Sequence, residues 1–165
     1  MARKYSDDKL KERFEHREKY FSSSLSGGKQ HDLLFEPYHV TGTEYRVLAV
    51  LFFTNGACEP SVIADKLNIL RQTMSKVTDS LAAKALVTRS AHPTDRRRIF
   101  IRLSPEGETL ARELLTLETD YNSAVTEHFT PEELERYRQL FQKMHAAREI
   151  ELRRILEARA LISKD

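Results

Sequence analysis

Residues 70–104 read LRQTMSKVTDSLAAKALVTRSAHPTDRRRIFIRLS, and the hydrophobic spacing changes in the middle of this stretch. In the first half, apolar residues recur every three or four positions, which predicts a helix with one buried face. The residues of that face are Leu70, Met74, Val77 and Leu81. After Ala85 the spacing becomes alternating, so residues 86–89 and 99–103 predict two strands. Residues 92–96 between them are turn-like, which makes the pair a β hairpin with a basic tip.

The residues before this stretch predict two further helices. Thr41 and Glu44 have the spacing of a capping box, in which each side chain accepts a hydrogen bond from the other residue's backbone N–H. Pro60 suits the first turn of a second, short helix, and Asn68 suits a left-handed turn after it. Three helices followed by two strands within residues 41–104 describe a winged helix-turn-helix.

Long helices are predicted on both sides of this module. Residues 6–25 have helical apolar spacing, with Leu10, Phe14, Phe21 and Leu25 near one face. Ser104 and Thr130 each stand at a helix start. The apolar stripes at both ends are too long to bury against one small winged helix, which predicts a homodimer. The expected fold is therefore mainly α with a small β hairpin (α+β). It places a winged helix-turn-helix at residues 41–104 between helical dimerisation segments at 1–40 and 105–165.

Charge is distributed unevenly along the 165 residues, although the net charge is only +2. Residues 41–104 carry 10 Lys or Arg against 5 Asp or Glu, a net of +5, whereas residues 105–165 carry 9 against 13, a net of −4. A local excess of positive charge indicates either a polyanion partner or an ordinary solvated surface. Charge alone leaves these two interpretations open.

Several classes of protein are excluded by what the sequence lacks. Its one cysteine excludes a disulfide framework and a multi-cysteine zinc site, and no histidine pairs with another ligand at zinc spacing. The sequence has no P-loop, dinucleotide fingerprint or Ser-His-Asp order, which predicts that it is not an enzyme and needs no metal or cofactor. It also has no apolar stretch of membrane-spanning length and no signal-peptide core, so a cytoplasmic protein without a membrane partner is expected.

Several runs in the middle of the chain match a known pattern. They are Thr43-Glu44-Tyr45-Arg46-Val47-Leu48, Ile63-Ala64-Asp65-Lys66-Leu67, Met74-Ser75-Lys76-Val77-Thr78-Asp79-Ser80-Leu81, Leu86-Val87, Asp95-Arg96-Arg97 and Leu103-Ser104-Pro105-Glu106-Gly107. On these runs the chain resembles the MarR family of bacterial transcription regulators, and the resemblance covers residues 43–110. The hairpin residues and the Leu-Ser-Pro-Glu-Gly run are the most specific part of the resemblance.

The resemblance implies a two-fold homodimer in which the N- and C-terminal helices of both subunits intertwine. It implies that the helix at 70–84 enters the major groove of double-stranded DNA and that the hairpin at 88–100 reaches the minor groove. A small, often phenolic or anionic, effector would bind between the two regions. Two positions depart from the family pattern: Leu70 stands where the family usually has a capping Ser or Thr, and Ala85 stands where it usually has Gly.

The residues expected to contact DNA lie on the 70–84 helix and the hairpin. Arg and Gln can pair with base edges, Ser, Thr and Lys suit bases or phosphates, and a narrow minor groove attracts arginine. The expected contacts are Arg71, Gln72, Thr73, Ser75 and Lys76 on the helix and Arg96, Arg97 and Arg98 on the hairpin. Strand alternation means that the three hairpin arginines do not all face the same way. By the family resemblance, Asp95 braces the hairpin and Arg97 reads the groove.

Two further features concern regulation. Tyr38, His39, Tyr45 and Arg46 lie where the resemblance implies an effector pocket, and aromatic walls with a cationic group would suit an aromatic carboxylate. Hinge packing is the alternative interpretation of these four residues.

Cys58 is the only cysteine in the sequence. A redox switch usually needs a second cysteine that forms a disulfide with the oxidised one, so a structural or incidental thiol is favoured.

The function expected from the sequence is that of a sequence-specific DNA-binding transcriptional regulator. The finer expectation is a ligand-responsive repressor that binds a pseudo-palindromic operator as a homodimer. The alternative is a winged-helix module for protein assembly, whose basic face binds an acidic protein partner. Arginines at the hairpin tip favour DNA, since a protein interface has no specific need for them.

Overall fold

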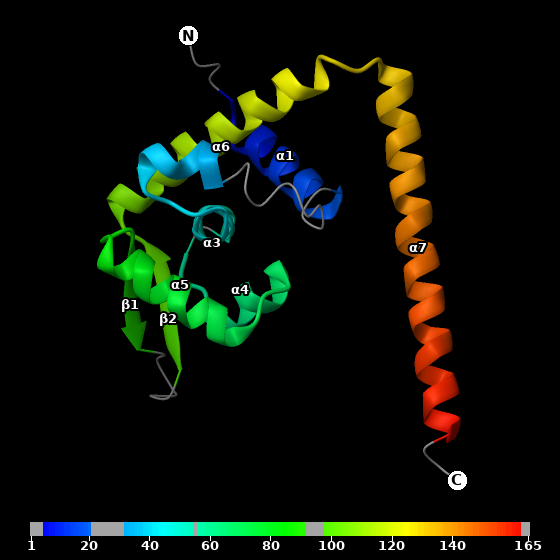
Figure 1. Cartoon of the computed structure of the whole chain (residues 1–165). Helices are drawn as coiled ribbons and strands as arrows, with labels where there is room; N and C mark the ends of the chain where they lie inside the picture. The colour runs from blue at the N-terminus through cyan, green and yellow to red at the C-terminus, as the bar shows by residue number, and fades with distance from the viewer. Residues whose placement is uncertain (1–4, 21–31, 55, 92–97, 163–165) are drawn as a thin grey trace. The chain divides into compact units, whose positions relative to one another are not determined.

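The structure is a computed structural model of the chain, and it describes residues 5–20, 32–54, 56–91 and 98–162. It is mainly helical with one antiparallel hairpin, which confirms the predicted fold class (Figure 1). The elements are α1 (Asp7–Tyr20), the 3-10 helix η1 (Glu36–Tyr38), α3 (Gly42–Thr54), α4 (Pro60–Leu67), α5 (Arg71–Ala83), β1 (Val87–Ala91), β2 (Ile99–Leu103), α6 (Pro105–Thr126) and α7 (Pro131–Ile162). The chain divides into two compact units, residues 1–121 and 122–165.

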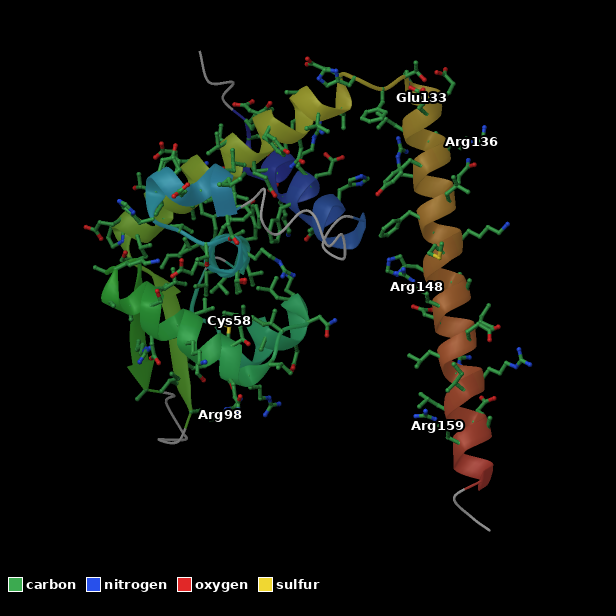
Figure 2. All side chains as sticks on the ribbon, viewed as in Figure 1. Cys58, Arg98, Glu133, Arg136, Arg148 and Arg159 are labelled. Carbon is green, nitrogen blue, oxygen red and sulfur yellow. The ribbon has the colours of Figure 1, made fainter. Side chains whose placement is uncertain are left out.

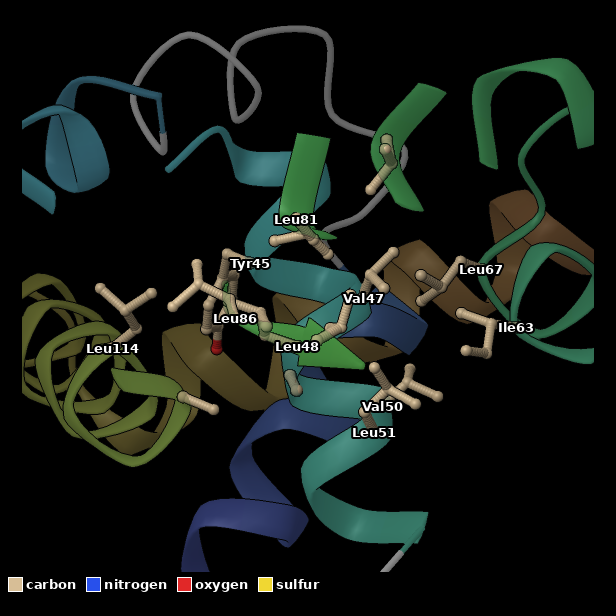
Figure 3. Close-up of a cluster of buried hydrophobic side chains, with 14 of the residues drawn as sticks. Tyr45, Val47, Leu48, Val50, Leu51, Ile63, Leu67, Leu81, Leu86 and Leu114 are labelled. Atoms are coloured by element: carbon tan, nitrogen blue, oxygen red, sulfur yellow. The ribbon is translucent and has the colours of Figure 1, made fainter. Parts of the chain in front are cut away.

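Helix α3 lies at the centre of the first unit. Most of its residues between Glu44 and Leu51 are buried, and their side chains pack against α4, α5 and α6 (Figure 3). Tyr45 is completely buried, stacks on Phe35 with ring centroids 4.4 Å apart, and donates a hydrogen bond from its hydroxyl to Glu118 of α6. A helix that is apolar on nearly every side is stable only when it is enclosed in this way.

The helix starts predicted from capping residues are confirmed. The Thr41 hydroxyl accepts from the Glu44 N–H at 3.2 Å, and the Glu44 carboxylate accepts from the Thr41 N–H at 2.8 Å. The same reciprocal pair joins Thr130 and Glu133 at the start of α7. Asn68 has φ 51° after α4, the left-handed conformation that its short polar side chain tolerates.

The junction between α5, the hairpin and α6 is tightly packed. Ala85 has φ 57°, a conformation that favours glycine, and its carbonyl accepts from the Ser104 hydroxyl at 2.7 Å. That hydroxyl also accepts from the Gly107 N–H at 2.9 Å, so Ser104 caps α6. A Cβ at Gly107 would lie only 1.9 Å from the carbonyl oxygen of Leu86, so only glycine allows this close approach.

Three apolar residues are placed differently from the sequence prediction. Leu70 was expected in the core but is 75% exposed, because it precedes α5 as its N-cap in an extended conformation and lies off the helix's apolar face. Leu10 and Phe14 were expected to need a partner subunit to cover them, but they are buried in the core of their own chain. The remaining predicted apolar residues of that stripe, Phe21 and Leu25, lie outside the described residues.

Gly107→Ala should lower the free energy of unfolding by about 1–3 kcal/mol, because the added methyl group forces the start of α6 away from Leu86. Thermal or urea denaturation measures this change. The matched control is Gly56→Ala, where the nearest atom to an added Cβ is 3.9 Å away and little change is expected. Equal effects from the two substitutions would contradict the packing described for this junction.

Candidate nucleic-acid interface

One side of α5 is buried and the other is exposed and polar. Met74, Val77 and Leu81 are buried, as their helical spacing predicts. The residues predicted to contact DNA on this helix are all exposed: Arg71, Gln72, Thr73, Ser75 and Lys76. The Ser75 hydroxyl donates to the carbonyl of Arg71 at 3.2 Å, so it already has a partner within the helix. The structure therefore exposes five polar side chains along the first turns of α5.

The far end of α5 is held against α3 by a buried carboxylate. Glu44 is 3% exposed and accepts hydrogen bonds from the Ser80 hydroxyl and the Lys84 ammonium group, both at 2.6 Å. Lys84 also donates to the carbonyl of His39 at 2.8 Å. Burial alone would raise the pKa of Glu44, but the hydrogen bonds from Lys84, Ser80 and Thr41 outweigh it and hold the pKa below its usual value of 4.5. The ionised carboxylate thus fixes the orientation of α5.

The hairpin is joined to the helices by backbone hydrogen bonds. Strand β1 pairs with β2 from Val87 opposite Leu103 to Ala91 opposite Ile99. Cys58, just before α4, forms a further antiparallel bridge with Ile101, and the two residues exchange N–H···O bonds of 2.9 Å in both directions. An ion pair between Arg89 of β1 and Asp79 of α5 adds a contact on the other strand. The base of the wing is therefore fixed to both α4 and α5.

Arg98, predicted to contact DNA, is paired within the chain. Its guanidinium group makes a two-pronged contact with the Glu59 carboxylate, in which Nε donates to Oε2 at 3.0 Å and Nη2 donates to Oε1. Such a fork fixes geometry as well as charge. Sequence reasoning did not identify Glu59, because it lies 39 positions from Arg98 and carries no local signal. Asp95, Arg96 and Arg97 lie outside the described residues.

The four residues predicted for an effector pocket have different surroundings in the structure. Tyr45 is enclosed in the core, and the Arg46 guanidinium group donates to the carbonyl of Leu67 at 3.0 Å. The Tyr38 hydroxyl donates to Glu113 of α6 at 3.0 Å, which raises the pKa of Tyr38. His39 borders an open depression, whose lining residues are Asp32, Leu33, Glu36, His39, Val40 and Thr41.

Cys58 is buried in the first unit (Figure 2). Burial raises the pKa of its thiol, so the protonated and less reactive form dominates near neutral pH. Both the burial and the backbone bridge to Ile101 agree with a structural thiol.

Within the described part of the chain, no cluster of three His, Cys, Asp or Glu residues is arranged to hold a metal ion. In the same described residues, no helix combines the length and the apolar composition needed to cross a membrane.

The helix-turn-helix and its anchored hairpin define a winged helix-turn-helix protein. Comparison with known families adds to this, because the MarR family model matches residues 39–98, from three residues before α3 to the residue before β2. The helix-turn-helix region of the chain is therefore similar to the MarR family over these residues.

Two curated relatives illustrate the similarity. The HTH-type transcriptional repressor YetL of Bacillus subtilis is 29% identical over 102 residues, which are 61% of this chain and 59% of YetL. The HTH-type transcriptional regulator PapX of Escherichia coli is 28% identical over 113 residues, which are 68% of this chain and 69% of PapX. The match thus spans less than two thirds of the length of YetL and slightly more than two thirds of the length of PapX.

Solved structures share the fold at low sequence identity. A Staphylococcus aureus MepR–DNA complex matches with a TM-score of 0.66 and 20% identity, over 87% of this chain and 99% of MepR. The C80S variant of E. coli MarR, complexed with operator DNA, matches with a TM-score of 0.62 and 17% identity, over 83% and 91% of the two chains. At these identities the likeness is one of fold.

Glu44→Gln should lower the free energy of unfolding at neutral pH by about 1–3 kcal/mol, because it removes the charge that pairs with Lys84. The folded pKa of Glu44 is depressed, so its contribution is present above the unfolded value of 4.5 and is lost as pH falls through the folded pKa. Urea denaturation at several pH values measures the difference between variant and wild type. That difference should shrink below about pH 4.5, and a pH-independent difference would contradict the proposed charge.

Proposed function

We propose that this protein is a DNA-binding transcriptional regulator that acts as a homodimeric repressor at a pseudo-palindromic operator. The observation that carries the proposal is the exposed polar start of α5, held in a fixed orientation by Glu44 and flanked by an anchored wing. The names of YetL and PapX, and the DNA-bound states of MepR and MarR, support the same function.

The exposed side chains of α5 have the chemistry needed to read a major groove. Arg71 can pair with both acceptors of a guanine, and Gln72 can pair with the donor and acceptor of an adenine. Lys76, one turn further along the helix, suits a phosphate. The recognition helix of a helix-turn-helix contacts base edges with its N-terminal residues, which is where Arg71 and Gln72 lie.

The wing arginines divide into two roles in this proposal. Arg97 contacts the minor groove, as the sequence resemblance implies, with Arg96 beside it and Asp95 bracing the hairpin. Arg98 directly precedes β2, at the loop end of the hairpin, and is already paired with Glu59, so we assign it to holding the wing in place. A minor-groove arginine responds to groove width and potential, so its contribution depends on A·T content and not on single base pairs.

The dimer is supported by the second unit. Helix α7 has 32 residues, a length of about 48 Å, and a single helix cannot bury an apolar stripe against itself. Its stripe contains aromatic and aliphatic side chains at helical spacing, namely Tyr137, Phe141, Met144, Leu152 and Ile155. Pairing with the same stripe of a second copy would bury it with two-fold symmetry.

The surroundings of the predicted effector residues bear on which small molecule the protein would accept. Tyr45 and Arg46 are engaged within the fold, and the depression at His39 carries the carboxylates of Asp32 and Glu36. Those two negative charges disfavour an aromatic carboxylate at that depression.

Arg71→Ala or Gln72→Ala should relax sequence preference at particular base pairs, by about 1–3 kcal/mol each where the contact is two-pronged. Lys76→Ala should weaken binding to all sequences and lower the slope of log K against log salt by about 1. Binding-site selection on randomised DNA, followed by affinity titration across salt concentrations, measures both effects. Half-sites should be roughly 10 base pairs apart.

Variants of the wing provide the control for this experiment. Arg97→Ala should weaken binding with a bias against A·T-rich flanks, whereas Arg98→Ala should leave the salt slope unchanged because Arg98 is paired with Glu59. If the wild type enriches no inverted repeat, or the Arg71 and Gln72 variants enrich the wild-type motif, the assignment of α5 is wrong. Binding of an acidic protein without any DNA preference would favour the assembly alternative instead.

Light scattering at micromolar concentration should give twice the chain mass of 19.2 kDa. Leu152→Glu combined with Ile155→Glu should produce monomers, because it places charges in the apolar stripe of α7. Arg153→Glu on the opposite side of the helix is the control and should leave the dimer intact. A monomeric wild type would rule out the proposed dimer and, with it, recognition of a palindrome.

A further inference from the structure

The side chain of Leu70 stands at the start of α5 but does not cap that helix. Leu70 is the N-cap of α5, with φ −65° and ψ 143°, and it makes no side-chain capping hydrogen bond. Ser, Thr, Asp and Asn favour this position because a side-chain oxygen accepts from an N–H of the first turn. Leucine has no such oxygen, so α5 begins without this stabilisation.

Leu70 does not stabilise the core either. Its side chain is 75% exposed, the largest exposed fraction among the large apolar residues that the structure describes. Neither capping nor packing therefore accounts for a leucine at this position. Departures from local folding rules that bring no gain in stability concentrate at functional sites.

The position of Leu70 indicates what covers it. Its carbonyl accepts from the Met74 N–H at 3.0 Å, so the backbone of Leu70 is fixed at the end of α5 that precedes Arg71. The exposed residues of α5 are polar, cationic or small, namely Arg71, Gln72, Thr73, Ser75, Lys76, Asp79 and Ala83. An apolar protein interface would need further large apolar side chains here, whereas a DNA groove offers both polar edges and isolated methyl groups.

We propose that Leu70 packs against the 5-methyl group of a thymine in the major groove and selects T·A at one position of each half-site. Among the four bases only thymine presents a methyl group there, and apolar side chains recognise it by contact. The inference rests on the proposed function, because it requires α5 to lie in the groove. The contact would determine sequence specificity at this position without any hydrogen bond to the base.

The test removes the methyl group from the DNA and the isobutyl group from the protein. Binding sites are first selected from randomised DNA with the wild-type protein, and each thymine is then replaced by deoxyuridine, which differs only in the methyl group. The wild type should lose about fourfold in affinity for each methyl removed at the one sensitive position, the ratio expected for burying one methyl-sized group. Leu70→Ala should bind the thymine and uracil forms equally.

Two variants control for folding and position. Leu70→Ser supplies the missing capping oxygen and should raise the melting temperature by about 2–4 °C while it also abolishes discrimination between thymine and uracil. A loss of discrimination in a more stable protein cannot result from unfolding. Val62→Ala removes an exposed apolar side chain from α4 and should keep the wild-type discrimination.

The outcomes separate this inference from the proposed function. A wild type that binds selected DNA but shows no preference for thymine at any position overturns the role of Leu70 alone. Retention of the full preference in Leu70→Ala has the same meaning. A wild type that enriches no DNA sequence overturns the proposed function and this inference together.

Discussion

The enclosure of α3 on nearly every side is the constraint on which the rest of the first unit depends. A helix in this position must satisfy the polar groups of its first turn without water. Glu44 does so by accepting from Thr41 and, at the same time, from Ser80 and Lys84 of α5 and its cap. Capping the central helix and orienting the neighbouring helix are therefore performed by one carboxylate, and neither can change without the other.

The wing is attached to the same unit through its two strands. Strand β2 reaches the segment before α4 through Ile101 and Arg98, and β1 reaches α5 through Arg89. The position of the wing relative to α5 is consequently determined by contacts within one chain.

Short-range signals in the sequence predicted most of the fold. The capping pairs at Thr41 and Thr130 and the left-handed turn at Asn68 involve neighbours within a few positions, so their geometry follows from local chemistry. Helical spacing failed at Leu70 because the residue before a helix is extended and does not share the helix's angular period. Nothing in the sequence predicted the pair between Glu59 and Arg98, since no local pattern links residues so far apart.

The amphipathic pattern at the N-terminus shows a different limit. It correctly indicated that Leu10 and Phe14 are covered, but a pattern of apolar residues does not specify whether the covering surface belongs to the same chain. In α1 the chain's own core provides it, with Phe14 meeting Tyr45 edge to face at a centroid distance of 6.2 Å. Sequence periodicity predicts which face is buried and leaves the identity of the neighbour to the tertiary structure.

The backbone bridge between Cys58 and Ile101 gives the wing a local opening equilibrium of its own. Swinging the hairpin away from α4 would break both hydrogen bonds together and expose two amides that lie 43 positions apart in the chain. Amides released by one opening event exchange their hydrogens with solvent at the same free-energy cost. These two amides therefore report wing detachment separately from the fraying of any helix, and binding that holds the wing closed would slow their exchange in parallel.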